Sequence, residues 1–283
     1  MPKLNNIQFK KENSVRISQR ESAIEHIGES VLKFFKDIYS ALLITGESVA
    51  ALWHAIKNPK KIRWRETLYY MDSCGADAVP IVSVLCFIMG LIIAIQSALQ
   101  LKKYGGDIFV ADAVGYSIIK ELAPFMVAII CTGRAGSAFA AEIGTMKVSE
   151  EIDAIYTMGL EPSRFLIVPK IIALTIVMPL LTIVGNLAGL LGGLLVAVVQ
   201  LQISFSAYYN RTFTILLPRH FAEGLVKSLT FAFIIAIIGC WKGLESGNDA
   251  QGVGRAATSA VVTSIFLIVI ADFAITMFVN VWF

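Results

Sequence analysis

The sequence predicts an all-α integral membrane protein in which five helices cross the bilayer. Composition is the first reason: 56% of the 283 residues are hydrophobic and 16% are charged, whereas soluble domains average about 45–50% and about 25%. The second is a set of apolar runs suited to crossing the hydrocarbon core. These runs cover residues 79–101, 114–132, 171–201, 225–240 and 256–282. The third is a polar helical segment between the second and third runs, which has no core of its own to fill.

The chain before the first run divides into two segments. Residues 1–23 are charged and poor in aromatic residues, so we expect a disordered cytoplasmic tail, and they contain no apolar stretch typical of a cleavable signal. Residues 24–57 carry apolar side chains at helical spacing and charges on the other face. This pattern favours an amphipathic helix lying in the membrane interface, with packing on another protein domain as the alternative.

A basic segment separates this helix from the first membrane span. It contains Lys60, Lys61, Arg63, Trp64 and Arg65. Cations and an indole next to a span suit anionic lipid headgroups.

The five runs differ in length. Residues 79–101 form an uncharged run of one span's length, whereas 171–201 would make about 46 Å of helix at about 1.5 Å per residue. Because that exceeds the hydrocarbon core of about 30 Å, this helix must tilt, bend near Pro179 or project beyond the bilayer.

The distribution of Lys and Arg predicts the orientation. Of the 24 such residues, 12 precede Val79. With the N-terminus in the cytoplasm, inside segments hold 18 and outside segments hold 4. The positive-inside rule therefore predicts a cytoplasmic N-terminus and, after five spans, a C-terminus on the opposite side.

This orientation places residues 142–160 in the cytoplasm. The segment combines an apolar stripe with acidic residues that follow a candidate N-cap, Ser149. Its candidate contact residues are Glu142, Met146, Glu150, Glu151, Ile152, Asp153, Ile155 and Tyr156. Such a helix can lie on the bilayer or insert into a groove on a partner, and the residues alone leave both open.

Four charged residues fall within or at the edges of the spans: Lys120, Glu121, Lys227 and Asp272. Each would cost roughly 2.5–3.5 kcal/mol at the bilayer centre, so we expect cross-span pairs. Adjacent helical residues point about 100° apart, so Lys120 and Glu121 should have different partners. The pairs could fix helix packing only, or serve in gating or in headgroup contact.

Gly185, Gly189 and Gly193 recur every four residues in the third run. They form a smooth strip where another helix backbone can approach closely. The strip could pack within one protomer or line a dimer interface.

Several function classes find no support. A net charge of +3 does not indicate nucleic-acid binding, and the four cysteines form no CxxC motif, so we expect no bound metal or cofactor. The segment Gly247 to Gly252 lacks the Lys of a Walker A loop. A membrane protease would need a catalytic set that the spans do not supply. A secondary transporter remains an alternative, although no internal repeat is visible.

The segment KELAPFMVAIICTGRAGSAFAAEIGTMKVSEEIDAIYTMGLEPSRFLIVPK closely resembles the signature region of the MlaE/YrbE family of ABC-transporter permeases. The resemblance covers nearly everything after residue 24, which implies one permease domain over 24–283. It also implies that 142–160 is the coupling helix that contacts a separate ATPase, which uses the ATP. The usual Arg-Glu pair reads Lys120-Glu121 here, which keeps the charge but loses the bidentate guanidinium.

The resemblance further implies movement of phospholipids between the inner and outer membranes of a bacterium, maintaining outer-membrane lipid asymmetry. A sterol or another lipid is the alternative cargo within the family. The implied partners are a periplasmic MCE-domain protein and often a STAS-domain protein. Since an ABC transporter has two ATP sites, a chain with one coupling helix should form a C2 homodimer. The implied location is the bacterial inner membrane, with the C-terminus in the periplasm.

Overall fold

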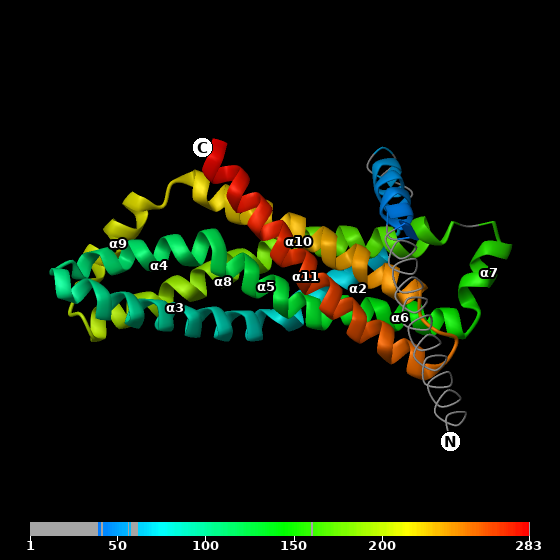
Figure 1. Cartoon of the computed structure of the whole chain (residues 1–283), viewed down its shortest axis with the longest axis horizontal. Coiled ribbons are helices and arrows are strands. Elements are labelled where there is room, and N and C mark those ends of the chain that lie inside the picture. Colours follow the sequence, from blue (N-terminus) through cyan, green and yellow to red (C-terminus); the bar gives the residue numbers. More distant parts are fainter. Residues whose placement is uncertain (1–38, 41, 56, 58–61, 160, 283) are drawn as a thin grey trace, which may run out of the picture. The chain divides into compact units, whose positions relative to one another are not determined.

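The computed structural model describes residues 39–40, 42–55, 57, 62–159 and 161–282. Every regular element among them is a helix (Figure 1). In the described part of the chain, five helical stretches are long and apolar enough to cross a membrane. These are Trp64–Leu101, Asp107–Val148, Ser163–Val199, Pro218–Leu244 and Ala250–Val279. The predicted fold class, an all-α membrane protein with five spans, is confirmed.

The chain divides into two units, Met1–Glu47 and Ser48–Phe283. The predicted tail 1–23 and the first part of the predicted interfacial helix 24–57 lie outside the described residues. In the first unit, residues 39–40 and 42–47 are helical. In the second unit, residues 48–55 are helical, and Ala51 and Ala55 are buried against Val168. The interfacial position of this helix stays a prediction.

The first span consists of α2 (Trp64–Gly75), a 3-10 turn η2 (Ala76–Ala78) and α3 (Val79–Leu101). Helix α3 has the bounds of the first apolar run. The helical stretch begins earlier, at α2, where Glu66 pairs with Arg63. Asp77 of η2 pairs with Arg134 of the second span.

The second span is a chain of helical pieces with two π-helical turns. It comprises η4 (Asp107–Phe109), α4 (Val110–Ser117), the π turn η5 (Ile118–Leu122), α5 (Ala123–Cys131), the π turn η6 (Thr132–Gly136) and α6 (Ser137–Val148). Pro124 has no N–H to offer the carbonyl of Lys120, which accounts for the altered winding at η5. Wide turns of this kind are often found at functional sites.

The third span is η7 (Ser163–Ile167) followed by α8 (Val168–Val199), which has Pro179 in its interior. Helices α3, α4 and α8 run side by side (Figure 1). The α3 and α8 backbones are in contact, since an added Cβ at Gly90 would lie 2.0 Å from the carbonyl oxygen of Gly189.

The glycine strip of the third span is packed inside the protomer. Gly185 contacts Cys86, Gly189 contacts Ile118, and an added Cβ at Gly193 would lie 2.5 Å from Val114. The strip therefore brings α8 against α3, η5 and α4 of its own chain.

The last part of the second unit contains α9 (Phe205–Ile215), α10 (Pro218–Leu244) and α11 (Ala250–Trp282). The Ser204 hydroxyl caps α9 by accepting from the N–H of Ala207 at 3.2 Å. Helix α10 packs on α5, α6, α8 and α11, while α11 crosses it diagonally (Figure 1). Helix α10 extends past the predicted run 225–240 at both ends. At its first end, the additional turns bury His220 and Glu223.

Candidate functional site: the buried charges and the α7 segment

Lys227 is the centre of a charge cluster that joins three spans. Its side chain is fully buried in α10, pairs with Glu121 of η5 and lies 2.9 Å from Asp272 of α11. Its ammonium also donates to the hydroxyl of Thr276 at 2.8 Å, and that hydroxyl donates to Glu121 at 3.3 Å. The structure thus brings together three of the four predicted intramembrane charges. One buried cation compensates two carboxylates that keep partial exposure.

Lys120, the fourth charge, has a different partner. Its ammonium lies 3.3 Å from Glu223 of α10 and donates to the hydroxyl of Tyr116 at 2.9 Å. The Lys120 and Glu223 side chains are almost completely buried, so each charge depends on the other. Consecutive residues of η5 therefore connect to α10 through two separate ion pairs.

Sequence reasoning missed Glu223 because it began the fourth span at residue 225. The signal was present, since Glu223 and Lys227 are four residues apart and share one face of α10. His220 lies on the same face and places its ring 5.2 Å from the ring of Tyr116.

A third buried lysine connects the second and third spans at their junction with α7. Lys170 of α8 has no exposed side-chain surface, and its ammonium lies 3.1 Å from a Glu142 oxygen in α6. The Tyr70 hydroxyl of α2 accepts from Lys170 at 2.7 Å and donates to Glu142 at 2.6 Å. Glu142, predicted as a partner contact, is therefore engaged within its own chain.

The predicted coupling helix 142–160 is divided between two elements. Residues 142–148 continue the second span as part of α6, and only α7 (Glu151–Thr157) forms a separate helix. Glu150 connects the two with a left-handed backbone, φ 59°. Met146 consequently lies on α6, half-buried, rather than on α7.

Helix α7 has one face toward its own chain and another toward the outside. Ile152 and Ile155 are buried. The acidic residues Glu150, Glu151 and Asp153 are exposed. Tyr156 and Met158 are exposed at 64% and 66%. The surface available to a partner is thus acidic and carries two large apolar side chains. Ile152 and Ile155, which were predicted as partner contacts, are buried and pack α7 against its own chain instead.

Further polar contacts fix the ends of the spans. Lys147 of α6 donates to the carbonyls of Leu244 and Ser246 at 2.7 and 2.8 Å, which holds α6 against the end of α10. Arg211 of α9 forms a bidentate pair with Asp112 of α4, and this hydrogen bonding raises the pKa of Arg211.

The described residues contain no group of three or more potential metal ligands. The four cysteines are buried and unpaired. The described residues form a helix bundle with internal ion pairs, and α7 projects from one end of it (Figure 1).

Known proteins are similar to this chain over most of its length. A family profile described as "Permease MlaE" matches residues 67–278. A probable ABC transporter permease protein of Rickettsia felis is 38% identical over 252 residues, which cover 88% of this chain and 95% of that protein. Another from Synechocystis sp. is 35% identical over 244 residues, covering 86% and 91%.

A third relative comes from a plant. The chloroplast protein TRIGALACTOSYLDIACYLGLYCEROL 1 of Arabidopsis thaliana is 33% identical over 218 residues, which cover 77% of this chain and 62% of that protein. The chain belongs to the MlaE permease family: it is a multi-pass membrane subunit of an ABC transporter, is not itself an enzyme, and works with a separate ATPase.

Proposed function

We propose that this permease moves phospholipids between the inner and outer membranes of a bacterium and so maintains the lipid asymmetry of the outer membrane. The pairing of its intramembrane charges carries the proposal. Lys120, Glu121, Lys227 and Asp272 all have partners in other spans. A cargo between the spans would therefore meet mainly hydrocarbon, which suits acyl chains better than an ion or a sugar.

The outward surfaces of the spans support the same class of cargo. Large apolar side chains are exposed along α3, α8 and α11, among them Ile88, Leu187 and Phe266. The plant relative also bears the name of a galactolipid. Membership of an ABC family supplies an ATPase as the energy source, so a secondary transporter is no longer needed as an alternative. A sterol or another lipid remains the alternative cargo.

The proposed assembly is a C2 homodimer with two ATPase subunits on its cytoplasmic side. Each ATPase would contact the exposed face of α7. The ATPase would bind and hydrolyse the ATP, and this chain would bind no cofactor. An MCE-domain protein would receive or deliver lipid on the periplasmic side, and a STAS-domain protein would bind the ATPase. The proposed orientation in the inner membrane has the N-terminus in the cytoplasm and the C-terminus in the periplasm, as the positive-inside rule predicts.

The contacts around α7 suggest how movement of the ATPase would reach the spans. Helix α7 follows directly on α6 and precedes η7, so displacing it moves the ends of the second and third spans. Lys170 joins these two ends through Glu142 and connects both to α2 through Tyr70. The ion pairs of the second span would then transmit the shift to the last two spans. Lys120–Glu223 joins η5 to α10, and Lys227–Asp272 joins α10 to α11.

Reconstitution tests this function. The permease, its ATPase and its MCE-domain partner would be placed in liposomes that contain a fluorescent phospholipid, and transfer between the liposomes and the MCE protein would be followed with and without ATP. We expect ATP-dependent phospholipid transfer that disappears when the Walker A lysine of the ATPase is replaced. ATP-dependent transfer of a labelled sterol with none of phospholipid would contradict the proposed cargo.

A further inference from the structure

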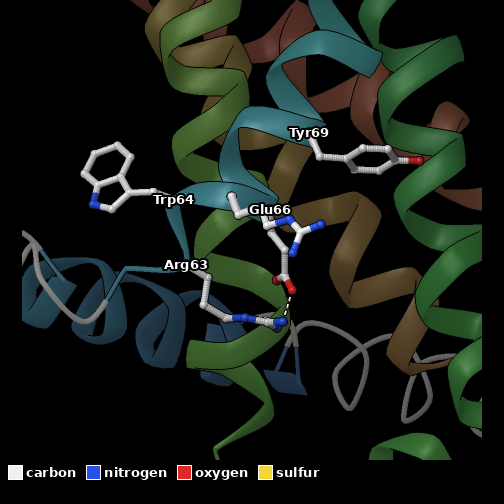
Figure 2. Close-up of a pocket in the computed structure, with 5 residues that line it drawn as sticks. Arg63, Trp64, Glu66 and Tyr69 are labelled. Carbon is white, nitrogen blue, oxygen red and sulfur yellow. Dashed lines mark ion pairs between the residues drawn. The ribbon is translucent and has the colours of Figure 1, made fainter.

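The beginning of α2 forms an open pocket that the transport mechanism does not use. Its volume is about 590 Å³, and its lining consists of Arg63, Trp64, Arg65, Glu66 and Tyr69 (Figure 2). The lining combines two guanidinium groups, one carboxylate and two aromatic rings with polar atoms. All five residues come from the first turns of one helix and the residue before it.

Two of the three charges in this pocket compensate each other. Arg63 forms an ion pair with Glu66, which Figure 2 shows as a dashed line. The Arg63 guanidinium also lies 3.8 Å from the ring centre of Phe165 in η7, which fixes its position. Arg65 has no hydrogen-bond or ion-pair partner among the described residues. Counting the residues that the structure describes, the pocket therefore has one uncompensated positive charge.

The face of α2 that carries Arg65 becomes more apolar in the next turn of the helix. Leu68 and Tyr69, three and four residues further on, lie on the same face as Arg65. Their exposed fractions are 59% and 67%. The Tyr69 ring packs edge-on against Tyr70 at 5.5 Å, so it has a rigid support. A cation is thus followed, one turn deeper along the span, by a phenol and an aliphatic side chain.

This order of groups matches the depth profile of a bilayer. The membrane-crossing stretch begins at Trp64, whose side chain is 48% exposed. Tryptophan and tyrosine concentrate where headgroups meet hydrocarbon, and Lys or Arg next to a span attract anionic lipids. The contact between Arg63 and Phe165 places the pocket beside η7, at the end of the bundle where α7 lies.

We propose that this pocket binds the headgroup of an anionic phospholipid in the leaflet on the α7 side. The Arg65 guanidinium would bind the phosphodiester, and the rings of Trp64 and Tyr69 would flank the glycerol region. An acyl chain would run along Leu68. One uncompensated cation suits a monoanionic phosphodiester better than a free phosphate dianion, whose second negative charge would have no cation to pair with. This lipid is a resident of the permease surface, so the inference does not depend on which cargo is transported.

Photolabelling of the full chain in nanodiscs tests the site. The probe is phosphatidylglycerol with a diazirine in its glycerol region, and mass spectrometry quantifies labelling of the peptide that contains residues 64–72. We expect Arg65→Gln to reduce this labelling about five-fold, the change expected for one cation at an anionic surface. Arg65→Lys should retain most of it, because the charge remains.

The control is Arg255→Gln, since Arg255 is also a cation at a helix start and its side chain is 73% exposed. It should leave labelling unchanged. Because Arg65 has no partner in the described parts of the chain, its variant should elute from size-exclusion chromatography like the wild type. Excess unlabelled phosphatidylglycerol should compete with the probe, and phosphatidylcholine or inorganic phosphate should not. Equal labelling of wild type and Arg65→Gln, or competition by inorganic phosphate, would overturn the assignment.

Discussion

The ammonium of Lys227 lies 2.9 Å from the carboxylate of Asp272, and the same buried ammonium pairs with Glu121. One side chain of α10 therefore connects the second span to the fifth. A single cation between two carboxylates makes the stability of the cluster depend on the lysine more than on either acid.

Replacing this lysine should destabilise the bundle. Lys227→Met leaves two carboxylates without a cation, a change that costs about 3–5 kcal/mol when the pair is fully buried. The cost should be lower here, since the Glu121 and Asp272 side chains are 33% and 24% exposed. Thermal unfolding of the purified chain in detergent measures it.

Asp272→Asn in the same variant should restore part of the lost stability, because only one uncompensated carboxylate then remains. Lys242→Met is the control on α10, because this lysine pairs with Glu245 three residues further along the chain and joins no other span by an ion pair among the described residues. It should change stability by less than about 1 kcal/mol. Equal melting temperatures for Lys227→Met and Lys242→Met would show that the cluster contributes nothing to packing.

The hydrogen bonds of the Tyr70 hydroxyl should contribute to the coupling between ATP hydrolysis and lipid transport. Tyr70→Phe removes two hydrogen bonds but leaves the ion pair between Lys170 and Glu142, so we expect a loss of about 1–2 kcal/mol in stability. If this contact transmits movement from α7 to α2, the variant should also hydrolyse more ATP per lipid transferred in the reconstituted system.

Tyr209→Phe is the control, because Tyr209 is exposed on α9, its ring lies against Phe205 and Phe213, and its hydroxyl has no hydrogen bond among the described residues. An unchanged ratio of ATP to lipid in Tyr70→Phe would restrict the role of this hydroxyl to stability.

Close approach of α3 and α8 should make certain glycines intolerant of a methyl group. An added Cβ would lie 2.0 Å from a carbonyl oxygen at Gly90 and 2.2 Å from one at Gly192. Alanine at either position forces the two backbones apart, at a cost of at least about 1–3 kcal/mol. Gly254→Ala in α11 has open space and should gain up to about 1 kcal/mol.

Melting temperatures in detergent distinguish these variants. If Gly90→Ala and Gly254→Ala both stabilised the protein, this would contradict the close backbone contact between α3 and α8.

The two faces of α7 should respond differently to substitution. Ile152→Asp places a charge in a buried position, so it should detach α7 from the chain and lower the melting temperature of the isolated permease. Tyr156→Ala should leave that temperature unchanged. It should nevertheless weaken binding of the ATPase about 30-fold if the exposed aromatic ring is a binding hot spot of about 2 kcal/mol.

Affinity capture of the ATPase by each purified variant measures the difference. Full capture by Tyr156→Ala would exclude its exposed ring as a contact.

The fold could be predicted well because long apolar runs with few charges are typical of helices that cross a bilayer. Helix α3 coincides with the run 79–101. Other helices exceed their runs, since a window without charges cannot show that Glu223 is neutralised by Lys120 or that Lys147 caps the end of α10. Those partners are distant in the sequence.

The same limitation affected residues 142–160. Ile143 and Met146 share an apolar stripe with Ile152, but the left-handed backbone at Glu150 interrupts the helix between them. Glutamate gives no local sign of that conformation, as a glycine would have done. Periodicity alone could therefore not distinguish the residues that face a partner from those that pack against the rest of the chain.

Site-specific crosslinking at α7 tests the central claim most directly. Benzoylphenylalanine would replace Tyr156 in one sample and Tyr209 of α9 in the other, within the complete transporter in cells. Contact between α7 and the ATPase predicts an ATPase adduct from position 156 and none from position 209. Adducts from position 209 alone, or equal yields from both positions, would contradict it.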